Sequence, residues 1–275
     1  MNPMKDIPNN FKRTSSLSHD DIAMARKILE GKQPFSIYLN AAIEDLKNGN
    51  NNRWFHFSSA GGLIMGIDFD ELRVISIIGD VEDEMLFIIA KNPMRTEFHL
   101  TKKYADRLLD IGKDRLLREH HLKYYLLNQE KPFCENLNGL RPLSKSDISL
   151  VERFYSNNYD GTIFSSWMLE QPFWGLFIGE NLIAAGGAIA VDKFGLAANI
   201  GNFLTAPQYR GRGYGKVVTR KLIDDLMRIG IKTFTLGTTE ENIPAWKTYE
   251  SVGFQLLEKR VEIEFSSILR HGNKI

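Results

Sequence analysis

The residues best suited to chemistry lie between positions 199 and 253 of this 275-residue chain. A run of glycines and basic residues at 210–216 follows a predicted strand (199–205) and opens a predicted helix (216–229). A strand, a glycine turn and a helix N-terminus together direct free backbone N–H groups at one point. Arg210, Arg212 and Lys216 add positive charge beside the helix dipole. The combination predicts a binding site for a pyrophosphate.

Three other interpretations of the glycine run fit less well. The first glycine of a Walker loop would fall at Arg210, and Val217 stands in place of the magnesium-binding hydroxyl. A dinucleotide fingerprint lacks its third glycine and would come earlier in the chain. An Arg-Gly nucleic-acid patch would need more basic charge than 35 Lys and Arg against 34 Asp and Glu provide.

A second motif follows about thirty residues downstream and opens a predicted helix at 244–252. Together the two motifs resemble those of the GCN5-related N-acetyltransferase (GNAT) superfamily. The resemblance is carried by Arg210, Gly213 and Gly215 in the first motif and by Asn242, Ala245, Tyr249, Gly253 and Phe254 in the second. It implies an α+β fold, with a mixed and mostly antiparallel sheet flanked by helices, and acetyl-CoA as co-substrate.

The resemblance also implies which residues hold the co-substrate. In that family the strand before the loop offers main-chain groups to the pantetheine arm, and the loop N–H groups hold the pyrophosphate. The implied binding residues are Phe203, Leu204, Thr205, Arg210, Gly211, Arg212, Gly213, Tyr214, Gly215, Lys216, Asn242 and Tyr249.

Tyr249 carries over as the general acid, since a phenol is protonated at neutral pH and can donate a proton to the departing thiolate. The alternative is that Tyr249 is an interfacial aromatic residue of its helix. Asparagine is also a favoured N-cap residue, so capping of the helix could by itself explain Asn242. Trp246 is either a packing residue or a cover for the adenine.

The sequence shows no clear general base. Many relatives place a glutamate on the strand that here spans 197–202, which contains no carboxylate. Glu240 or Glu241 could act directly or through water, and Asn202 could orient a water molecule. Alternatively, the amine arrives already neutral.

The catalytic domain is predicted over residues 139–275. Ser146 or Asp147 is predicted to cap its first helix, and residues 173–178 and 182–188 form a hairpin. Gly186 and Gly187 permit a bulge or a close approach by substrate. Tyr159, Trp167 and Phe173 fall where relatives line the acceptor groove, or else in the core. Residues 255–265 are predicted as two short strands.

Residues 1–135 are predicted to form a second α+β domain. Ser18 is the first residue of a predicted helix cap, and a second helix starts at Pro34. Strands are predicted at 54–57, 63–69, 74–78, 85–89 and 120–127, with a helix at 101–112. This order echoes the C-terminal half, which suggests a degenerate tandem copy of the fold without the cofactor loop. The alternative is an unrelated domain that shapes the acceptor site.

The composition limits the partners, the metal or disulfide content and the compartment that we expect. A hydrophobic content of 43% supports a full core, and the near-neutral charge argues against nucleic acid or membrane as the main partner. Cys134 is the only cysteine, which excludes an internal disulfide, and the six histidines show no metal-ligand spacing, so no metal is expected. Without a signal run or a membrane-length apolar stretch, the sequence predicts a cytoplasmic protein.

We therefore expect an acyltransferase that moves an acetyl group from acetyl-CoA to a primary amine of a small molecule or peptide. The amine would attack directly in a ternary complex, since Cys134 lies outside both motifs. A non-catalytic acetyl-CoA-binding sensor or scaffold, and a transferase that uses a longer acyl-CoA, are the alternatives. The sequence leaves the acceptor and the assembly open, a homodimer included.

Overall fold

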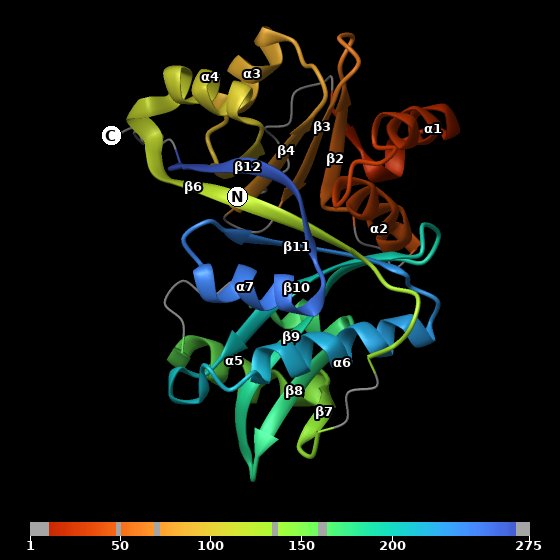
Figure 1. Cartoon of the computed structure of the whole chain (residues 1–275). Helices are drawn as coiled ribbons and strands as arrows, with labels where there is room; N and C mark the ends of the chain where they lie inside the picture. Colours follow the sequence, from red (N-terminus) through yellow and green to blue (C-terminus); the bar gives the residue numbers. More distant parts are fainter. Residues whose placement is uncertain (1–10, 48–50, 69–71, 134–136, 159–163, 268–275) are drawn as a thin grey trace, which may run out of the picture. The chain divides into compact units, whose positions relative to one another are not determined.

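The computed structural model describes residues 11–47, 51–68, 72–133, 137–158 and 164–267 (Figure 1). Its contacts group the chain into two compact units that do not split it at one point. Unit 1 comprises Met1–Lys123, Thr239–Glu241 and Lys259–Ile275, and unit 2 comprises Tyr124–Thr238 and Asn242–Glu258. Cys134 and Tyr159 lie outside the described residues.

The described residues of unit 1 form four α-helices and several strands. These are β1 (Lys12–Arg13), α1 (His19–Ile28), α2 (Phe35–Lys47), β2 (Arg53–Phe57), β3 (Leu63–Asp68), β4 (Leu72–Ile78), α3 (Asp83–Ala90), β5 (Arg95–Leu100), α4 (Lys102–Gly112) and the first part of β6 (Leu116–Asn128). The predicted cap at Ser18 is confirmed, because its hydroxyl accepts the Asp21 N–H and Asp21 accepts the Ser18 N–H.

The sheet of unit 1 has the strand order β1-β2-β3-β4-β5-β12-β6, in which β12 is Gln255–Phe265. Its two faces bury different apolar clusters, because successive residues of a strand point to opposite sides. Trp54, Phe98 and Phe265 lie in one cluster with α3 and α4. Phe55 packs in the other with residues of α1 and α2.

Unit 2 repeats the same order of elements. These are β7 (Leu140–Leu143), α5 (Ile148–Asn158), the 3₁₀ helix η5 (Ser166–Glu170), β8 (Phe173–Ile178), β9 (Asn181–Asp192), β10 (Ala197–Thr205), the 3₁₀ helix η6 (Pro207–Tyr209), α6 (Tyr214–Arg228), β11 (Thr233–Thr239), α7 (Ile243–Val252) and the start of β12.

The strand order of unit 2 is β6-β11-β10-β9-β8-β7. Apolar residues of α6 and α7, such as Leu222 and Val252, form one core cluster with the strands. Residues of α5 and η5, such as Tyr155 and Met168, form another. The result is a mixed, mostly antiparallel sheet with flanking helices, as predicted.

The two halves of the chain exchange their last strands. The middle strands pair in parallel in both units, β4 with β5 and β10 with β11. In unit 1 the next strand after β5 is β12, from the end of the chain, in antiparallel pairing. In unit 2 the next strand after β11 is β6, from the first half of the chain.

Several predicted elements need correction. Residues 85–89 lie in helix α3, not in a strand, and the strand β5 at Arg95–Leu100 was not predicted. Residues 255–265 form one strand, β12, instead of two. The predicted cap at Ser146 or Asp147 lies inside the 3₁₀ helix Lys145–Asp147, which precedes α5 and begins at its own N-cap, Ser144, in a capping box with Asp147.

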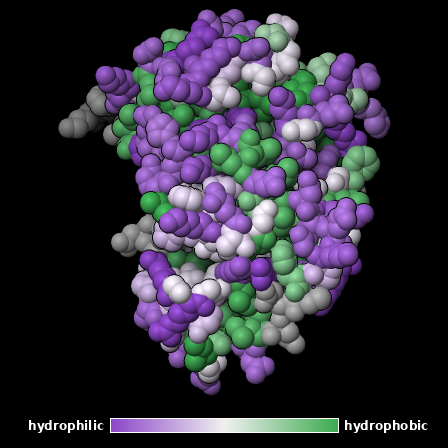
Figure 2. All heavy atoms as spheres, in the orientation of Figure 1, coloured by the Kyte–Doolittle hydropathy of each residue, from purple (hydrophilic) through white to green (hydrophobic). Residues whose placement is uncertain are grey.

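The face drawn in Figure 2 is mostly hydrophilic, with hydrophobic residues in separate small groups. In the part of the chain that the structure describes, every helix is too short or too polar to cross a membrane.

Candidate cofactor-binding and catalytic site

The strand β10 carries a bulge in the segment predicted to hold the pantetheine arm. Gly201 pairs with Gly187 and Leu204 with Ala185, so three steps on β10 match two on β9. The extra residue is Asn202, with a left-handed φ of 54°. Asparagine tolerates this conformation better than most residues. Two groups hold it: the Tyr155 hydroxyl donates to its carbonyl oxygen, and its side-chain amide donates to the Met168 sulfur.

Near this bulge β10 separates from β11. The two parallel strands pair only from Ala197 to Asn199, with partners Thr233 to Thr235, although both continue further. Beyond the bulge, the Ala206 N–H donates to Ile183 on β9 at 2.9 Å. Because N–H groups alternate along a strand, that of Thr205 faces the edge from which β11 has parted. An extended ligand could pair with this edge.

The loop between β10 and α6 presents a series of N–H groups. Arg210 donates its backbone N–H to Pro207, and the next N–H with a backbone partner in the loop is that of Val217, which donates to Gly213. Gly213 is the N-cap of α6 and offers no side chain to the first turn. The N–H groups of residues 211–216 are therefore available to an anion.

Two of the loop glycines are required by backbone conformation. Gly211 has φ 74° and Gly213 has φ 80°, and a Cβ on either would meet nothing within 4 Å. These glycines are therefore needed for their left-handed φ and not for space.

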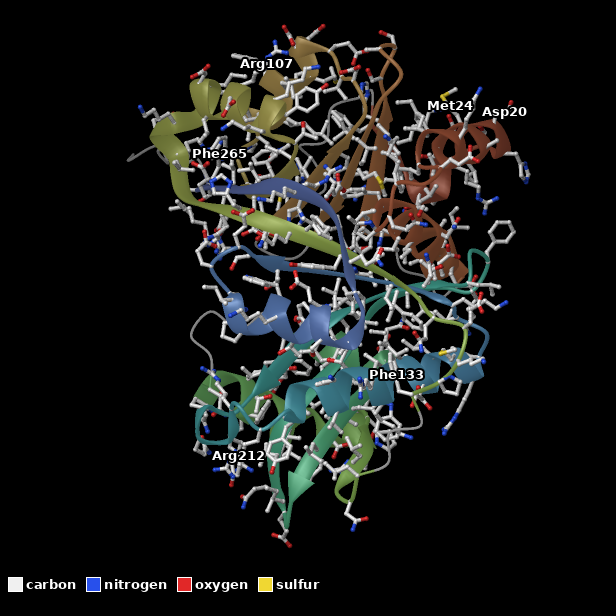
Figure 3. All side chains as sticks on the ribbon, viewed as in Figure 1. Asp20, Met24, Arg107, Phe133, Arg212 and Phe265 are labelled. Carbon is white, nitrogen blue, oxygen red and sulfur yellow. The ribbon has the colours of Figure 1, made fainter. Side chains whose placement is uncertain are left out.

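Basic side chains surround this loop. The Arg210 Nε donates to the Thr205 carbonyl at 3.0 Å, which ties the loop to the end of β10. Arg212 is exposed, lies 5.8 Å from the centre of the Tyr209 ring, and reaches away from the loop in Figure 3. The predicted pyrophosphate residues thus come together as a basic, N–H-rich helix N-terminus.

Tyr249 on α7 lies beside the bulge. Its ring centroid is 6.1 Å from that of Phe203 and 6.4 Å from that of Tyr125, and its side chain is buried. Burial raises the pKa of Tyr249, so the phenol stays protonated at neutral pH. Among the described residues its hydroxyl has no hydrogen-bond partner, which leaves its proton available to a ligand.

Asn242 is the N-cap of α7, and its side chain accepts the Ala245 N–H at 3.3 Å. Capping alone therefore accounts for an asparagine here. Trp246, one turn inside the helix, packs against the core that contains Tyr249.

The two glycines of β9 make room for rings of the protein. A Cβ on Gly186 would stand 2.1 Å from the Phe203 ring, and one on Gly187 would stand 2.0 Å from the Phe173 ring. Phe173 is itself fully buried, so it belongs to the core, and Trp167 is half-buried on η5. The close approach that these glycines permit is thus made by aromatic side chains.

The candidate bases lie in different surroundings. The Glu240 carboxylate pairs with Lys259 at 2.8 Å, and this hydrogen bond lowers the pKa of Glu240. Glu241 is exposed. The Asn202 amide donates one N–H to the Met168 sulfur.

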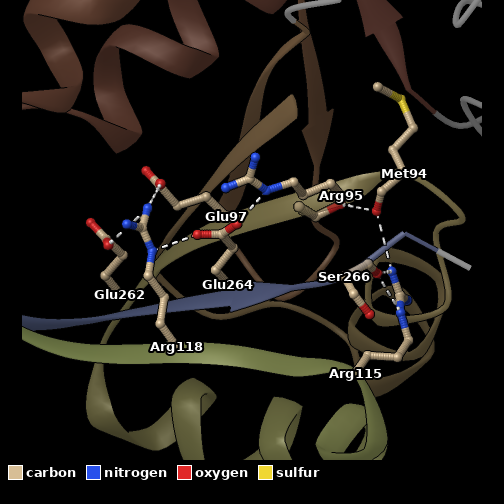
Figure 4. A network of polar contacts seen from close by, with 9 residues as sticks. Met94, Arg95, Glu97, Arg115, Arg118, Glu262, Glu264 and Ser266 are labelled. Atoms are coloured by element: carbon tan, nitrogen blue, oxygen red, sulfur yellow. Dashed lines mark hydrogen bonds and ion pairs between the residues drawn. The ribbon is translucent and has the colours of Figure 1, made fainter. Parts of the chain in front are cut away.

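A charged cluster that spacing could not reveal lies in unit 1. Ligand atoms of Glu97, His99 and Glu262 come within 4.8 Å of one another, the arrangement that a metal ion would need. Arg118 lies 2.9 Å from Glu97 and 3.7 Å from Glu262 and also pairs with Glu264 (Figure 4). We interpret the cluster as an ion-pair network, since guanidinium groups already balance its carboxylates.

Tyr155 and Met168, which hold the bulge, were missed as site residues. Nothing in the sequence spacing of Tyr155 indicates a backbone partner 47 positions away.

A family model and a curated relative match part of this chain. Residues 146–254 match the model of the acetyltransferase (GNAT) family. An N-acetylaspartate synthetase from Xenopus tropicalis is 30% identical over 119 residues, which cover 43% of this chain and 40% of that protein. The match thus spans less than half of that relative.

Solved structures resemble nearly the whole chain. A Drosophila protein covers 95% of it at 14% identity with a TM-score of 0.71, and all of that protein is matched. A GCN5-related N-acetyltransferase from Sphaerobacter thermophilus covers 95% at 10% identity, with 97% of that protein matched and a TM-score of 0.61. At these identities the likeness concerns the fold alone.

Proposed function

From the GNAT-family domain at residues 146–254, we propose that this protein is an N-acetyltransferase that transfers an acetyl group from acetyl-CoA to a primary amine. The observation that carries the proposal is that β10 has a bulge within it and an N–H-rich loop after it. β10 leaves β11 after Asn199, close to the bulge at Asn202, and the loop at 210–216 presents N–H groups and basic side chains.

The residues present fit acetyl-CoA as a substrate. The pyrophosphate would bind the N–H groups of residues 211–216, assisted by the charges of Arg212 and Lys216. The pantetheine arm would pair with the open edge of β10 at Phe203, Leu204 and Thr205, as a strand would. The acyl end would then reach the bulge, beside Tyr249.

Tyr249 is the proposed general acid. In direct transfer, the amine nitrogen bonds to the thioester carbon and the carbon–sulfur bond breaks. The Tyr249 hydroxyl donates its proton to the departing sulfur, and the proton that the acylated nitrogen loses passes through water to restore the phenol. No covalent bond to the protein is needed, and holding both reactants together supplies much of the rate.

The acceptor amine is proposed to enter in its neutral form, because the carboxylates weighed as bases are paired or exposed. The rate at limiting amine should then rise with pH up to the pKa of the acceptor. A small amino acid is a sensible first acceptor, in view of the relative named as an N-acetylaspartate synthetase. Peptide amines are the next class to screen.

The proposal is tested by titrating acetyl-CoA into the full chain and by measuring thiol release with an amine panel. Gly213→Ala should weaken acetyl-CoA binding about tenfold or more, because a Cβ at φ 80° strains the loop. Gly179→Ala is the matched control: its φ is 59°, its Cβ is equally unobstructed, and it lies in the β8–β9 turn. If both variants bind like the parent, the loop does not hold the pyrophosphate.

We also propose that the first half of the chain is a degenerate copy of the fold that binds no acetyl-CoA. The element order and the parallel middle pair are those of the second half. Between β4 and the first residue of α3, however, the chain places Asp80 and Glu82, followed by Asp83 in the helix, where the second half has Arg210 and Arg212. Acidic groups there would repel a pyrophosphate. The titration should therefore give one site per chain, and two equal sites would refute this part.

A further inference from the structure

We infer that an open cavity beside α5 binds a free α-amino acid with an apolar side chain. The cavity has a volume of about 250 Å³ and lies between α5 and the turn that joins β8 to β9. Its lining includes Arg153, Phe154 and Asn157 from α5 and Glu180, Asn181 and Leu182 from the turn and the start of β9. None of these residues has a part in the proposed acetyl transfer, so the inference does not depend on that function.

The two charged residues of the cavity have opposite signs and come from different elements. Arg153 and Asn157 are one turn apart on α5, so they share a face of the helix. Glu180 belongs to the turn on the other side of the cavity. In the part of the chain that the structure describes, neither Arg153 nor Glu180 forms an ion pair, and both are exposed. A ligand that carries both charges can therefore pair with both residues.

The chemistry of the lining favours a zwitterion. A guanidinium binds a carboxylate through two parallel N–H donors, and a carboxylate pairs with an ammonium group. An α-amino acid carries both groups on one carbon, whereas the two charged ends of a peptide lie further apart. The side-chain amides of Asn157 and Asn181 make no hydrogen bond to any described residue, so they can bind the remaining donors and acceptors of the ligand.

The floor of the cavity is apolar. Phe154 is 5% exposed and Leu182 is 8% exposed, and both belong to the core cluster that contains residues of α5 and η5. An apolar side chain would cover these two residues, whereas a charged side chain would lose its hydration there. Pockets for drug-sized ligands start at roughly 300 Å³. A cavity of about 250 Å³ therefore suits a smaller molecule, of the size of leucine.

The cavity is separate from the site at the bulge. Leu182 stands three residues before Ala185 and five before Gly187, the β9 partners on either side of the bulge. At about 3.4 Å per residue, these separations are roughly 10 and 17 Å along the strand. Attack on a thioester requires the nitrogen to approach the carbon to about 3 Å. The amino acid in this cavity is therefore an effector and not the acceptor.

Helix α5 connects the cavity to the bulge. Phe154 lines the cavity, and the next residue, Tyr155, donates its hydroxyl to the Asn202 carbonyl. A ligand that packs on Phe154 would thus stabilise the same helix that holds the bulge. Occupancy should slow hydrogen exchange in α5 and at residues 201–204.

Leucine is the probe, and its binding to the full chain is measured by isothermal titration without acetyl-CoA. Arg153→Gln and Glu180→Gln should each weaken binding about 10- to 100-fold, since each removes a charge-assisted interaction. Both residues are exposed, so neither change threatens the fold. Arg228→Gln on α6 and Glu152→Gln on α5 are the matched controls, because both residues are exposed and neither lines the cavity. They should bind leucine like the parent.

Ligand analogues test the role of each charge. N-acetylleucine lacks the ammonium group, so Glu180→Gln should not weaken its binding further. Leucinamide lacks the carboxylate, so Arg153→Gln should not weaken its binding further. Aspartate should bind about tenfold more weakly than leucine, or less, because its side-chain carboxylate would face the apolar floor.

The outcomes separate this inference from the proposed function. Failure of leucine to bind, or equal binding by the parent and the two cavity variants, would overturn the inference. Slower exchange in other helices but not in α5 would place the ligand elsewhere and would also overturn it. A protein that transfers acetyl groups without binding leucine would leave the proposed function intact, and one that binds leucine without acetyl transfer would leave the cavity assignment intact.

Discussion

Arg95 on β5 donates to the carboxylate of Glu264 on β12, although 169 positions separate the two residues in the chain. The contact is part of a longer ladder, in which Val261 to Phe265 pair with Leu100 to Thr96. The apolar residues of this stretch, Val261, Ile263 and Phe265, are buried in unit 1. The C-terminal strand therefore completes the core of the first half of the chain.

This exchange predicts the result of a truncation. A chain that ends at Glu258 should lose the cooperative unfolding of unit 1, because β5 would lose its neighbour and the core would lose three large side chains. A cut at residue 267, which retains β12, is the control. Hydrogen exchange of β4 and β5 amides would measure the effect, and unchanged protection in the shorter chain would show that β12 is dispensable.

Tyr249→Phe should lower kcat by about 100-fold, in the usual range for a lost general acid, with little change in the Kd for acetyl-CoA. Since burial raises the pKa of Tyr249, the parent should show no loss of kcat from its ionisation at neutral or mildly alkaline pH. Thiol release followed across pH at saturating substrates checks both points. A variant with parental kcat would remove Tyr249 from the mechanism.

The conformation of the loop at 210–216 could be predicted because its signals are local. Glycines at positive φ, basic side chains and a helix start all fall within seven consecutive residues, 210–216. The sequence could not predict the bulge, because Asn202 is held in its conformation by Tyr155 and Met168 on other elements. Helix α3 was mistaken for a strand because Met85, Leu86 and Ile89 are apolar and buried, and a short apolar run fits either structure.

The exchange of the last strands between the two halves could not be predicted from the sequence either. The sequence of residues 255–265 predicts a strand but does not identify the strand with which it pairs. The charged residues of β12 find partners on β5. Glu262 stands opposite His99 and Glu264 opposite Glu97. No spacing within either segment predicts that register.

His99 should make the stability of unit 1 depend on pH. Burial lowers the pKa of His99, and the charge of Arg260 acts in the same direction. The hydrogen bond and charge of Glu97 and the charge of Glu262 outweigh both effects, so the pKa of His99 is raised overall. The stabilisation is thus complete below the unfolded pKa of about 6.5 and is lost as pH rises through the higher folded pKa. His99→Gln should cost more stability near pH 6 than near pH 8.5.

Urea unfolding of parent and variant at the two pH values measures this difference. His19→Gln, at an exposed position in α1, is the control and should show the same cost at both. A cost for His99→Gln that does not change with pH would mean that His99 is not protonated in the folded protein.

Asp68 joins a buried charge network in unit 1. Its carboxylate accepts the Arg73 Nε at 2.7 Å and the Trp54 Nε1 at 2.9 Å, and Arg73 is 1% exposed. Asp68→Ala would leave the Arg73 guanidinium buried without its counter-charge, so we expect a loss of about 3–5 kcal/mol. Asp106→Ala breaks an exposed pair with Lys102 and should cost about 0.5 kcal/mol or less. Equal losses in the two variants would contradict the argument.

The lack of space beside Gly186 predicts the effect of a larger residue at this position of β9. A Cβ there would meet the Phe203 ring at 2.1 Å, so Gly186→Ala must displace the ring next to Tyr249 and should destabilise unit 2 by about 1–3 kcal/mol. Gly201→Ala places its Cβ 3.5 Å from Ile189, an ordinary contact, and should be far milder. Thermal melting of the two variants compares them directly. Because Phe203 carries the peptide unit that Tyr155 holds, the displaced ring should also weaken acetyl-CoA binding. A Gly186→Ala protein with parental melting and binding would show that the ring has room to move without consequence.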